Sequence, residues 1–146
     1  MLGISASTRY DPILLIDEVN LTHGEFRICD KLERKYFKSK PYTYSKSRYI
    51  KPSSSKVSEE YCNSWDGISY WYDDQRLEVI TIFFPRRDTT LRGISVGHTQ
   101  RQVEAVYGKP TWNIGIDGIG YSNICFLLSD SLVYGIYIYD ENDCED

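Results

Sequence analysis

Residues 91–110 read LRGISVGHTQRQVEAVYGKP and predict a short, capped helix. Thr99 and Gln102 have the spacing of a capping box, in which side-chain groups satisfy backbone donors that the first helical turn leaves unpaired. Apolar residues then recur at helical spacing through Tyr107. Gly108 follows where a left-handed C-terminal cap belongs. The segment therefore predicts a helix over Thr99–Tyr107.

Three β-strands are expected after this helix. Trp112–Ile116 and Ile119–Leu128 flank Asp117-Gly118, and an Asp-Gly pair favours a tight hairpin because its turn requires a positive φ at both positions. Leu132–Tyr139 is the third expected strand, with alternate residues on its two faces. The second half of the chain is thus interpreted as one helix followed by a three-stranded meander.

The first half follows the same order. Gly24–Ile28 is expected to be extended, and Asp30–Phe37 is expected to form a short amphipathic helix. The strands Tyr61–Trp65, Ile68–Tyr72 and Leu77–Phe84 should follow. At an offset of 56 residues, the apolar positions of the last two strands fall on those of the last two strands of the second half.

These patterns predict one compact domain built from two related halves, residues 1–90 and 91–146. The Asp-Gly-Ile triplets that begin at Asp66 and Asp117 are 51 residues apart, which predicts that the second hairpin is longer by five residues. The expected fold class is α+β, with tandem α-β-β-β units forming a curved antiparallel sheet and short helices on one face.

One motif resembles a known architecture. Gly93-Ile94-Ser95-Val96-Gly97, followed by Thr99, the helix and Tyr107-Gly108-Lys109-Pro110, resembles beta-lactamase-inhibitor proteins and is similar to the small lipoproteins of the outer-membrane protein assembly machinery. Phe26-Arg27-Ile28-Cys29-Asp30 with Tyr36-Phe37 resembles a degraded form of it. The resemblance implies a protein-binding scaffold, as in inhibitors, immunity proteins and assembly factors, and it implies no catalytic residues. The signal peptide and lipid-attachment cysteine of the assembly lipoproteins are not recognised here, so an envelope role is not expected.

Charge is distributed unevenly along the chain. Residues 27–56 carry ten basic and two acidic side chains, a net charge of +8, whereas residues 57–146 carry six basic and fifteen acidic side chains, a net charge of −9. The whole chain has a formal net charge of −4. This division favours a polarised surface that steers a charged partner, and the overall acidity argues against a general nucleic-acid binder.

Residues 38–56 read KSKPYTYSKSRYIKPSSSK and are expected to form a long polar loop. Six basic residues and no acidic residue are interleaved with tyrosines there. Such a loop suits a nucleic-acid backbone with stacked bases, or an acidic protein surface, and a solvated insertion without function is the third interpretation. Lys46, Arg48 and Lys51 are its candidate contacts.

The expected function is protein binding without catalysis. The chain is interpreted as an immunity or inhibitor protein that neutralises a cognate toxin or enzyme by covering its active site through the concave face of the sheet. Trp and Tyr dominate binding hot spots, and the candidate anchors are Trp65, Tyr70, Trp71, Tyr72 and Trp112. Asp73 and Asp74 complete the candidate contacts, although tolerance of turn geometry explains them better. The alternative is a nucleic-acid-facing or phage-type regulator that uses residues 38–56.

No enzymatic activity and no cofactor are expected. His23 and His98 are the two histidines, and neither has a partner acid or nucleophile at recognisable spacing. Residues 115–120, GIDGIG, are similar in composition to a phosphate loop. They lie between two expected strands rather than before a helix, so the context of that motif is missing.

The cysteines predict a reducing compartment and no metal site. Cys29, Cys62, Cys125 and Cys144 form no CxxC pair and match no zinc signature. Cys29 and Cys125 are expected to be buried thiols, and Cys144, in the acidic tail, is expected to be free. No window approaches the ~20 apolar residues that cross a bilayer, so a cytoplasmic location is expected. The sequence does not predict the oligomeric state.

Overall fold

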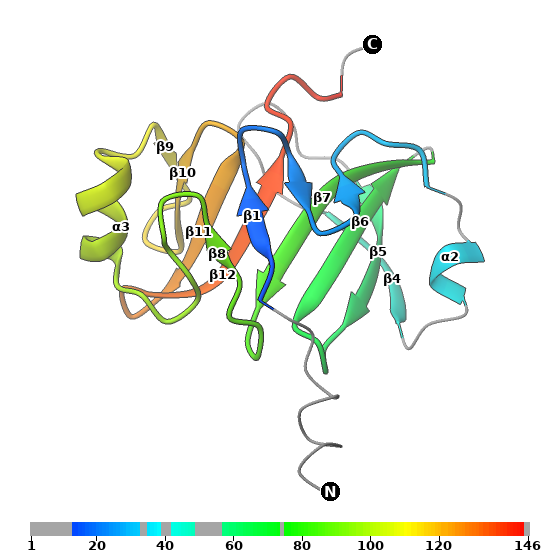
Figure 1. Ribbon diagram of the computed structural model, residues 1–146, viewed down its shortest axis with the longest axis horizontal. Coiled ribbons are helices and arrows are strands. Elements are labelled where there is room, and N and C mark those ends of the chain that lie inside the picture. Colours follow the sequence, from blue (N-terminus) through cyan, green and yellow to red (C-terminus); the bar gives the residue numbers. More distant parts are fainter. Residues whose placement is uncertain (1–12, 33–34, 39–41, 49–56, 74, 145–146) are drawn as a thin grey trace, which may run out of the picture.

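The computed structural model describes residues 13–32, 35–38, 42–48, 57–73 and 75–144. Most of this part of the chain is β-strand, and the strands form two sheets that lie in separate layers (Figure 1). Helix is confined to two short segments.

The larger sheet has eight antiparallel strands, four from each half of the chain, in the order β4-β5-β6-β7-β12-β11-β10-β9. The strands of the first half are β4 (Thr43–Arg48), β5 (Val57–Asn63), β6 (Ile68–Asp73) and β7 (Arg76–Phe83). Those of the second half are β9 (Trp112–Asn113), β10 (Gly118–Tyr121), β11 (Ile124–Ser129) and β12 (Leu132–Tyr139). Because β7 pairs with β12 in the middle, the two halves form one continuous sheet.

The smaller sheet lies across one face of the larger one. Its strands are β1 (Leu15–Asp17), β2 (Thr22–His23), β3 (Phe26–Arg27) and β8 (Thr89–Thr90), in the order β3-β2-β1-β8. β1 pairs with β8 in parallel. In Figure 1 this sheet and helix α3 (Gln100–Tyr107) stand in front of the larger sheet. The main hydrophobic core fills the space between the layers and joins Ile16 and Ile28 to the buried side chains of both halves.

The predicted α+β class, with tandem α-β-β-β units and helices on one face, is therefore wrong. The protein is β-rich with two sheets, and the smaller sheet supplies much of the layer that was assigned to helices. Its strands are only two or three residues long. Such short strands show no recognisable alternation of apolar and polar residues, so the period-of-two signal is missing from residues 13–28.

The predicted helix over Thr99–Tyr107 is confirmed as α3. Thr99 accepts a hydrogen bond from the backbone N–H of Gln102, and the Gln102 side chain accepts one from the backbone N–H of Thr99. Gly108 caps the other end with a φ of 84°. Val103 is fully buried against the core, so one face of this helix is fixed by packing and its start is fixed by local hydrogen bonds.

The predicted helix over Asp30–Phe37 shrinks to α2, Lys35–Lys38. The backbone N–H of Leu32 donates to Gln75, and that of Cys29 donates to Leu77. These bonds hold residues 29–32 against the start of β7 as an extended segment. A helix cannot begin at Asp30 while those backbone groups are paired with a neighbouring strand.

The two halves of the larger sheet repeat one hydrogen-bonding scheme. Strand residues correspond at an offset of 56: Leu77 accepts from Cys29 as Val133 accepts from Gly97, at 2.7 and 2.8 Å. The donors themselves correspond at an offset of 68, because the connection between the donor segment and its partner strands is longer in the first half. The predicted offset of 56 therefore relates strands that occupy equivalent places.

The repeat includes a β-bulge in each half. The register shifts between Trp71 and Tyr72 on β6 and between Leu127 and Leu128 on β11, again 56 residues apart. On β12 the extra residue is Tyr134, so the alternation expected along Leu132–Tyr139 is interrupted there. Val133 joins Ile136 and Ile138 in the main core rather than Tyr137 and Tyr139.

The predicted relation between the two hairpins is wrong. Ile119–Leu128 is not one strand but β10 and β11, joined through Ser122 and Asn123. The turn before β6 therefore corresponds to this connection, with Gly67 and Asn123 at φ values of 67° and 63°. The second hairpin is the shorter one, and Asp117-Gly118 lies in the turn between β9 and β10. Within the described residues, no helix is long and apolar enough to span a membrane.

Candidate functional site

The face of the larger sheet that points away from the smaller sheet carries a second apolar cluster. Val79, Cys125, Tyr137 and Tyr139 are buried there, and Trp71, Trp112, Ile114 and Leu127 are partly buried against them. We call these eight residues the aromatic face. All of them belong to the larger sheet or to the turn after β9, so no described residue of the smaller sheet or of a helix contributes to this cluster.

Strand register explains why these side chains converge. Trp71, Val79 and Tyr139 are direct neighbours across β6, β7 and β12. Tyr137 and Cys125 are opposed on the next pair of strands, one step along the same face. The bulges bring both rows to the face opposite the main core, because each inserts one residue and reverses the alternation.

Trp112 lies flat on the sheet because residue 120 is glycine. A Cβ atom at Gly120 would lie 2.0 Å from the indole ring of Trp112. The indole N–H donates to the Tyr139 hydroxyl at 3.1 Å, and the two ring centroids are 6.4 Å apart. This close approach fixes one flank of the aromatic face in a single orientation.

Trp71 forms the other flank. Its indole N–H donates to Thr81 Oγ1 at 3.2 Å, so the polar edge of the ring is bonded to the sheet. Trp71 and Trp112 therefore stand on either side of one buried cluster, each partly exposed and each held by a hydrogen bond. An indole that is held in place loses little further freedom when a partner covers it.

The titratable groups beneath these rings are neutral near pH 7. Burial raises the pKa of the Cys125 thiol to about 12, and burial also raises the pKa of the Tyr137 and Tyr139 hydroxyls above their ordinary value. The centre of the aromatic face is thus uncharged, which keeps the cost of excluding water from it low.

The β5 side of this face is polar. Glu60 accepts hydrogen bonds from Ser45 at 3.2 Å and, at shorter range, from Ser69. Cys62 is a half-buried free thiol on the same strand, and burial, followed by the charge of Glu60, raises its pKa. The face therefore grades from apolar at its centre to acidic along β5.

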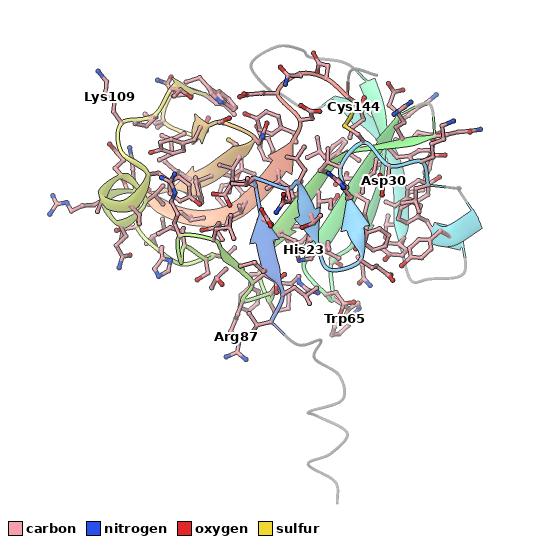
Figure 2. The ribbon with its side chains drawn as sticks, turned by 45° about the horizontal axis from the view of Figure 1, so that its top comes forward. His23, Asp30, Trp65, Arg87, Lys109 and Cys144 are labelled. Carbon is pink, nitrogen blue, oxygen red and sulfur yellow. A yellow bond between two sulfur atoms is a disulfide. The ribbon has the colours of Figure 1, made fainter. Side chains whose placement is uncertain are left out.

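The predicted aromatic anchors separate into three environments. Tyr70 and Tyr72 are 4 and 3% exposed in the main core, which corrects their interpretation as exposed anchors. Trp71 and Trp112 belong to the aromatic face. Trp65 is 82% exposed on the turn between β5 and β6, at the edge of the molecule where Figure 2 also shows Arg87. The structure therefore brings together two of the five.

The predicted charged contacts do not gather on the aromatic face. Lys46 is exposed on the edge strand β4, where it pairs with Glu59 of β5 in the strand register, and Arg48 ends β4. Asp73 ends β6. Asp74 and Lys51 lie outside the described residues. The expected loop over residues 38–56 is corrected in part, because residues 43–48 form a strand.

A buried charged cluster escaped sequence analysis. His23 Nε2 is 2.7 Å from Asp88 Oδ2, the Arg86 guanidinium reaches the same oxygen at 2.5 Å, and Leu14 N–H donates to Asp88 Oδ1 at 2.8 Å. Burial raises the pKa of Asp88, but the hydrogen bonds from His23, Arg86 and Leu14 outweigh burial and hold it below its ordinary value. Since His23 and Asp88 are each 1% exposed, this cluster braces the smaller sheet rather than facing a ligand.

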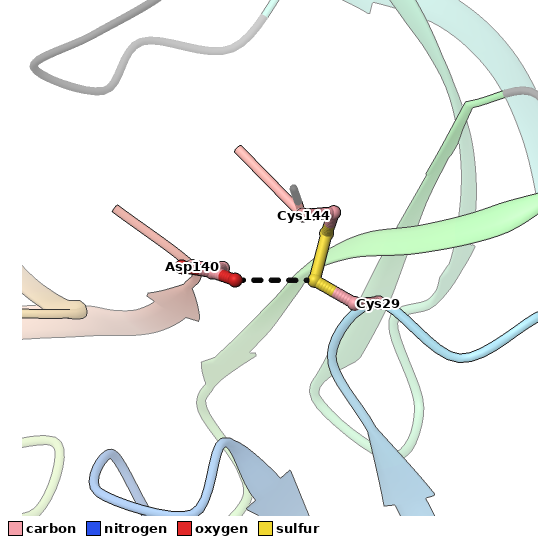
Figure 3. A group of neighbouring side chains, drawn as sticks. All are labelled: Cys29, Asp140 and Cys144. Atoms are coloured by element: carbon pink, nitrogen blue, oxygen red, sulfur yellow. Dashed lines mark hydrogen bonds between the residues drawn. A yellow bond between two sulfur atoms is a disulfide. The ribbon is translucent and has the colours of Figure 1, made fainter. Parts of the chain in front are cut away.

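Cys29 and Cys144 form a disulfide, so the predictions of a buried Cys29 thiol and a free Cys144 are wrong (Figure 3). The prediction of a reducing compartment loses its basis for this pair. Cys125 is a buried free thiol, as predicted. His98 accepts a hydrogen bond from the Ser95 N–H at 2.8 Å, which gives it a local structural role.

The aromatic face is thus the strongest candidate surface by composition and geometry. It combines two held indole rings, a neutral buried centre and an acidic border. Comparison with known proteins found no matching family model, no matching curated protein and no matching solved structure.

Proposed function

We propose that this protein is a non-enzymatic binding module, an immunity or inhibitor protein that neutralises a cognate toxin or enzyme. The single observation that supports the proposal is the aromatic face, an apolar cluster on the side of the larger sheet that the smaller sheet leaves uncovered. A contiguous apolar patch of this kind on a protein surface is typical of interaction sites.

The composition of the face supports a protein partner. Trp and Tyr are the residues most enriched at binding hot spots, and Trp71 and Trp112 offer ring surface over a centre that carries no charge. The acidic border at Glu60 would favour a basic rim on the partner and would act mainly on the association rate. In this scheme the partner's active site is covered by the sheet face.

Recovery of the partner and measurement of its affinity test the proposal. The protein is used to capture binding proteins from native lysate, and the recovered partner is identified by mass spectrometry. Surface plasmon resonance then compares variants whose folding is checked by circular dichroism. Trp71→Ala should weaken the complex by about 2 kcal/mol or more, because a central aromatic anchor is lost.

Trp65→Ala is the matched control, because Trp65 is exposed at one edge of the molecule and belongs to neither apolar cluster. It should change the affinity by less than about 0.5 kcal/mol, as expected of a residue outside the contact. The opposite ranking, with Trp65 important and Trp71 neutral, would refute the aromatic face as the binding site.

The alternative, a regulator that contacts nucleic acid through residues 38–56, makes a different prediction. Binding of random oligonucleotides would then weaken steeply with salt and with neutralisation of Lys46 and Arg48. The pairing of Lys46 with Glu59 and the bond from Tyr44 to Glu59 at 2.9 Å place acid beside these basic residues, which favours the protein partner. The cytoplasm stays the proposed compartment, where the Cys29–Cys144 pair would be kept reduced.

A further inference from the structure

Three potential metal ligands meet where the C-terminal segment crosses the loop after β3. Cys29 Sγ, Cys144 Sγ and a carboxylate oxygen of Asp140 all lie within 4.8 Å of one another (Figure 3). They come from separate parts of the chain, and the two cysteines are 115 residues apart. A spacing of that kind matches no zinc signature, which is why the sequence predicted no metal site.

We propose that reduction converts this disulfide into a binding site for a thiophilic divalent cation, with the Cys29 and Cys144 thiolates and Asp140 Oδ2 as ligands. Two sulfur ligands with an oxygen ligand suit zinc, which binds Cys, His and carboxylate groups in tetrahedral sites. A solvent molecule or Glu78, whose Oε2 is 3.4 Å from Cys144 Sγ, completes the coordination.

The spacing of the ligand atoms fits such an ion. Zn–S bonds of about 2.3 Å and Zn–O bonds of about 2.1 Å place a sulfur and an oxygen ligand about 3.6 Å apart in a tetrahedron. Asp140 Oδ2 is 3.4 Å from Cys29 Sγ. The sulfurs must separate to about 3.8 Å once their bond is broken, and a Cα–Cα distance of 5.3 Å leaves room for this by side-chain rotation.

Asp140 is held in the orientation that the site requires. Its Oδ1 accepts a hydrogen bond from Asn142 N–H at 2.8 Å, and its backbone carbonyl accepts one from Asp143 N–H at 3.0 Å. These bonds leave Oδ2 directed at Cys29, as Figure 3 shows. Hydrogen bonds of this kind orient a ligand before the metal arrives.

Electrostatics favours a cation over an empty reduced site. Thiolates at Cys29 and Cys144 would stand beside two carboxylates, those of Asp140 and Glu78, and Glu78 is only 4% exposed. The nearest basic side chain with a described contact, Arg76, donates to the Cys29 carbonyl at 3.2 Å. A divalent cation neutralises this gathering of negative charge, whereas without it the sulfurs stay protonated.

The chemistry balances with a thiol reductant. Two reductant thiols give up two electrons and two protons and become a disulfide, while the Cys29–Cys144 bond breaks and each sulfur takes one electron and one proton. The cation then displaces both protons. Either the S–S bond or the metal therefore ties the C-terminal segment to Cys29, and the redox state selects which one does so.

Cobalt binding to the reduced, metal-free protein tests this proposal, because thiolate ligands give Co²⁺ an intense near-ultraviolet absorption. The reduced wild type should bind one equivalent with that absorption, Zn²⁺ should abolish it by displacement, and the oxidised protein should show none. Cys144→Ser should lose the absorption, and Asp140→Asn should weaken binding about tenfold or more.

The double variant Cys62→Ser/Cys125→Ser is the control, because it keeps the proposed ligands and removes the other two thiols. Its cobalt spectrum should equal that of the wild type. Absence of thiolate absorption in the reduced wild type, its survival in Cys144→Ser, its loss in the double control or unchanged binding in Asp140→Asn would each overturn the site. The wild-type result does not depend on the folding of any variant.

Discussion

The two halves of the larger sheet share their backbone pairing but differ in what surrounds it. Leu77 and Val133 accept equivalent hydrogen bonds, and both halves carry a bulge at the same place. The second half adds an eight-residue helix that buries Val103, whereas the first half has a four-residue helix and a cavity of about 300 Å³ beside Leu77. Backbone pairing is therefore the repeated feature, and side-chain packing is what each half solves separately.

The halves also stabilise their buried polar residues in different ways. His23 at the start of the first hairpin depends on Asp88, which is far away in sequence. Thr90 at the start of the corresponding hairpin accepts bonds from the backbone of Arg92 and Ile94 at 3.3 and 3.1 Å. The first arrangement is long-range and charged, and the second is local and neutral.

The largest effect should come from breaking the charged arrangement. Asp88→Asn leaves Arg86 and His23 without their buried acceptor, and we expect it to lower the free energy of unfolding by about 3 to 5 kcal/mol. Thr90→Val removes only neutral bonds and should cost about 1 kcal/mol. Urea unfolding followed by circular dichroism measures both, and equal costs would contradict the contrast between the halves.

The same substitution should change the response to acid. The folded-state pKa of Asp88 lies below its ordinary value of 3.8, so its stabilising effect is complete above about pH 4 and is lost as the pH falls through the folded-state pKa. The stability difference between wild type and Asp88→Asn should therefore shrink below pH 4. A difference that stays constant down to pH 2 would show that ionisation of Asp88 does not stabilise the fold.

A somewhat smaller effect should separate the two turns with positive φ. A Cβ atom at Gly67 would lie 2.2 Å from the carbonyl oxygen of Phe83, and this contact with backbone cannot relax by side-chain rotation. We expect Gly67→Ala to destabilise the protein by about 2 to 3 kcal/mol. Asn123→Gly, at the equivalent place, loses only its side-chain bonds and should cost about 1 kcal/mol.

The smallest effect should distinguish the two expected helix starts. Thr99→Ala removes the capping box of α3 and should cost about 1 kcal/mol. Asp30→Ala should stay within about 0.5 kcal/mol, because Asp30 is exposed and precedes an extended segment rather than a helix. Equal losses in thermal unfolding would restore Asp30 as a helix cap and contradict the extended segment.

Local signals determined α3, β12 and the offset of 56 residues. The capping box, the cap at Gly108 and the alternation in Leu132–Tyr139 act over a few residues, so they can be recognised without a partner segment. Trp71 was predicted to be one of several aromatic anchors for the same reason. Alternation places Trp71 and its neighbours on opposite faces but does not say which face is buried.

Only the tertiary structure decided the remaining features. Tyr70 and Tyr72 are buried because the smaller sheet covers their face, and that sheet is made of strands too short to show a period. Cys29 meets Cys144 across 115 residues, and His23 meets Asp88 across 65. Contacts of this range follow from how the layers pack, and no periodicity or spacing within one segment encodes them.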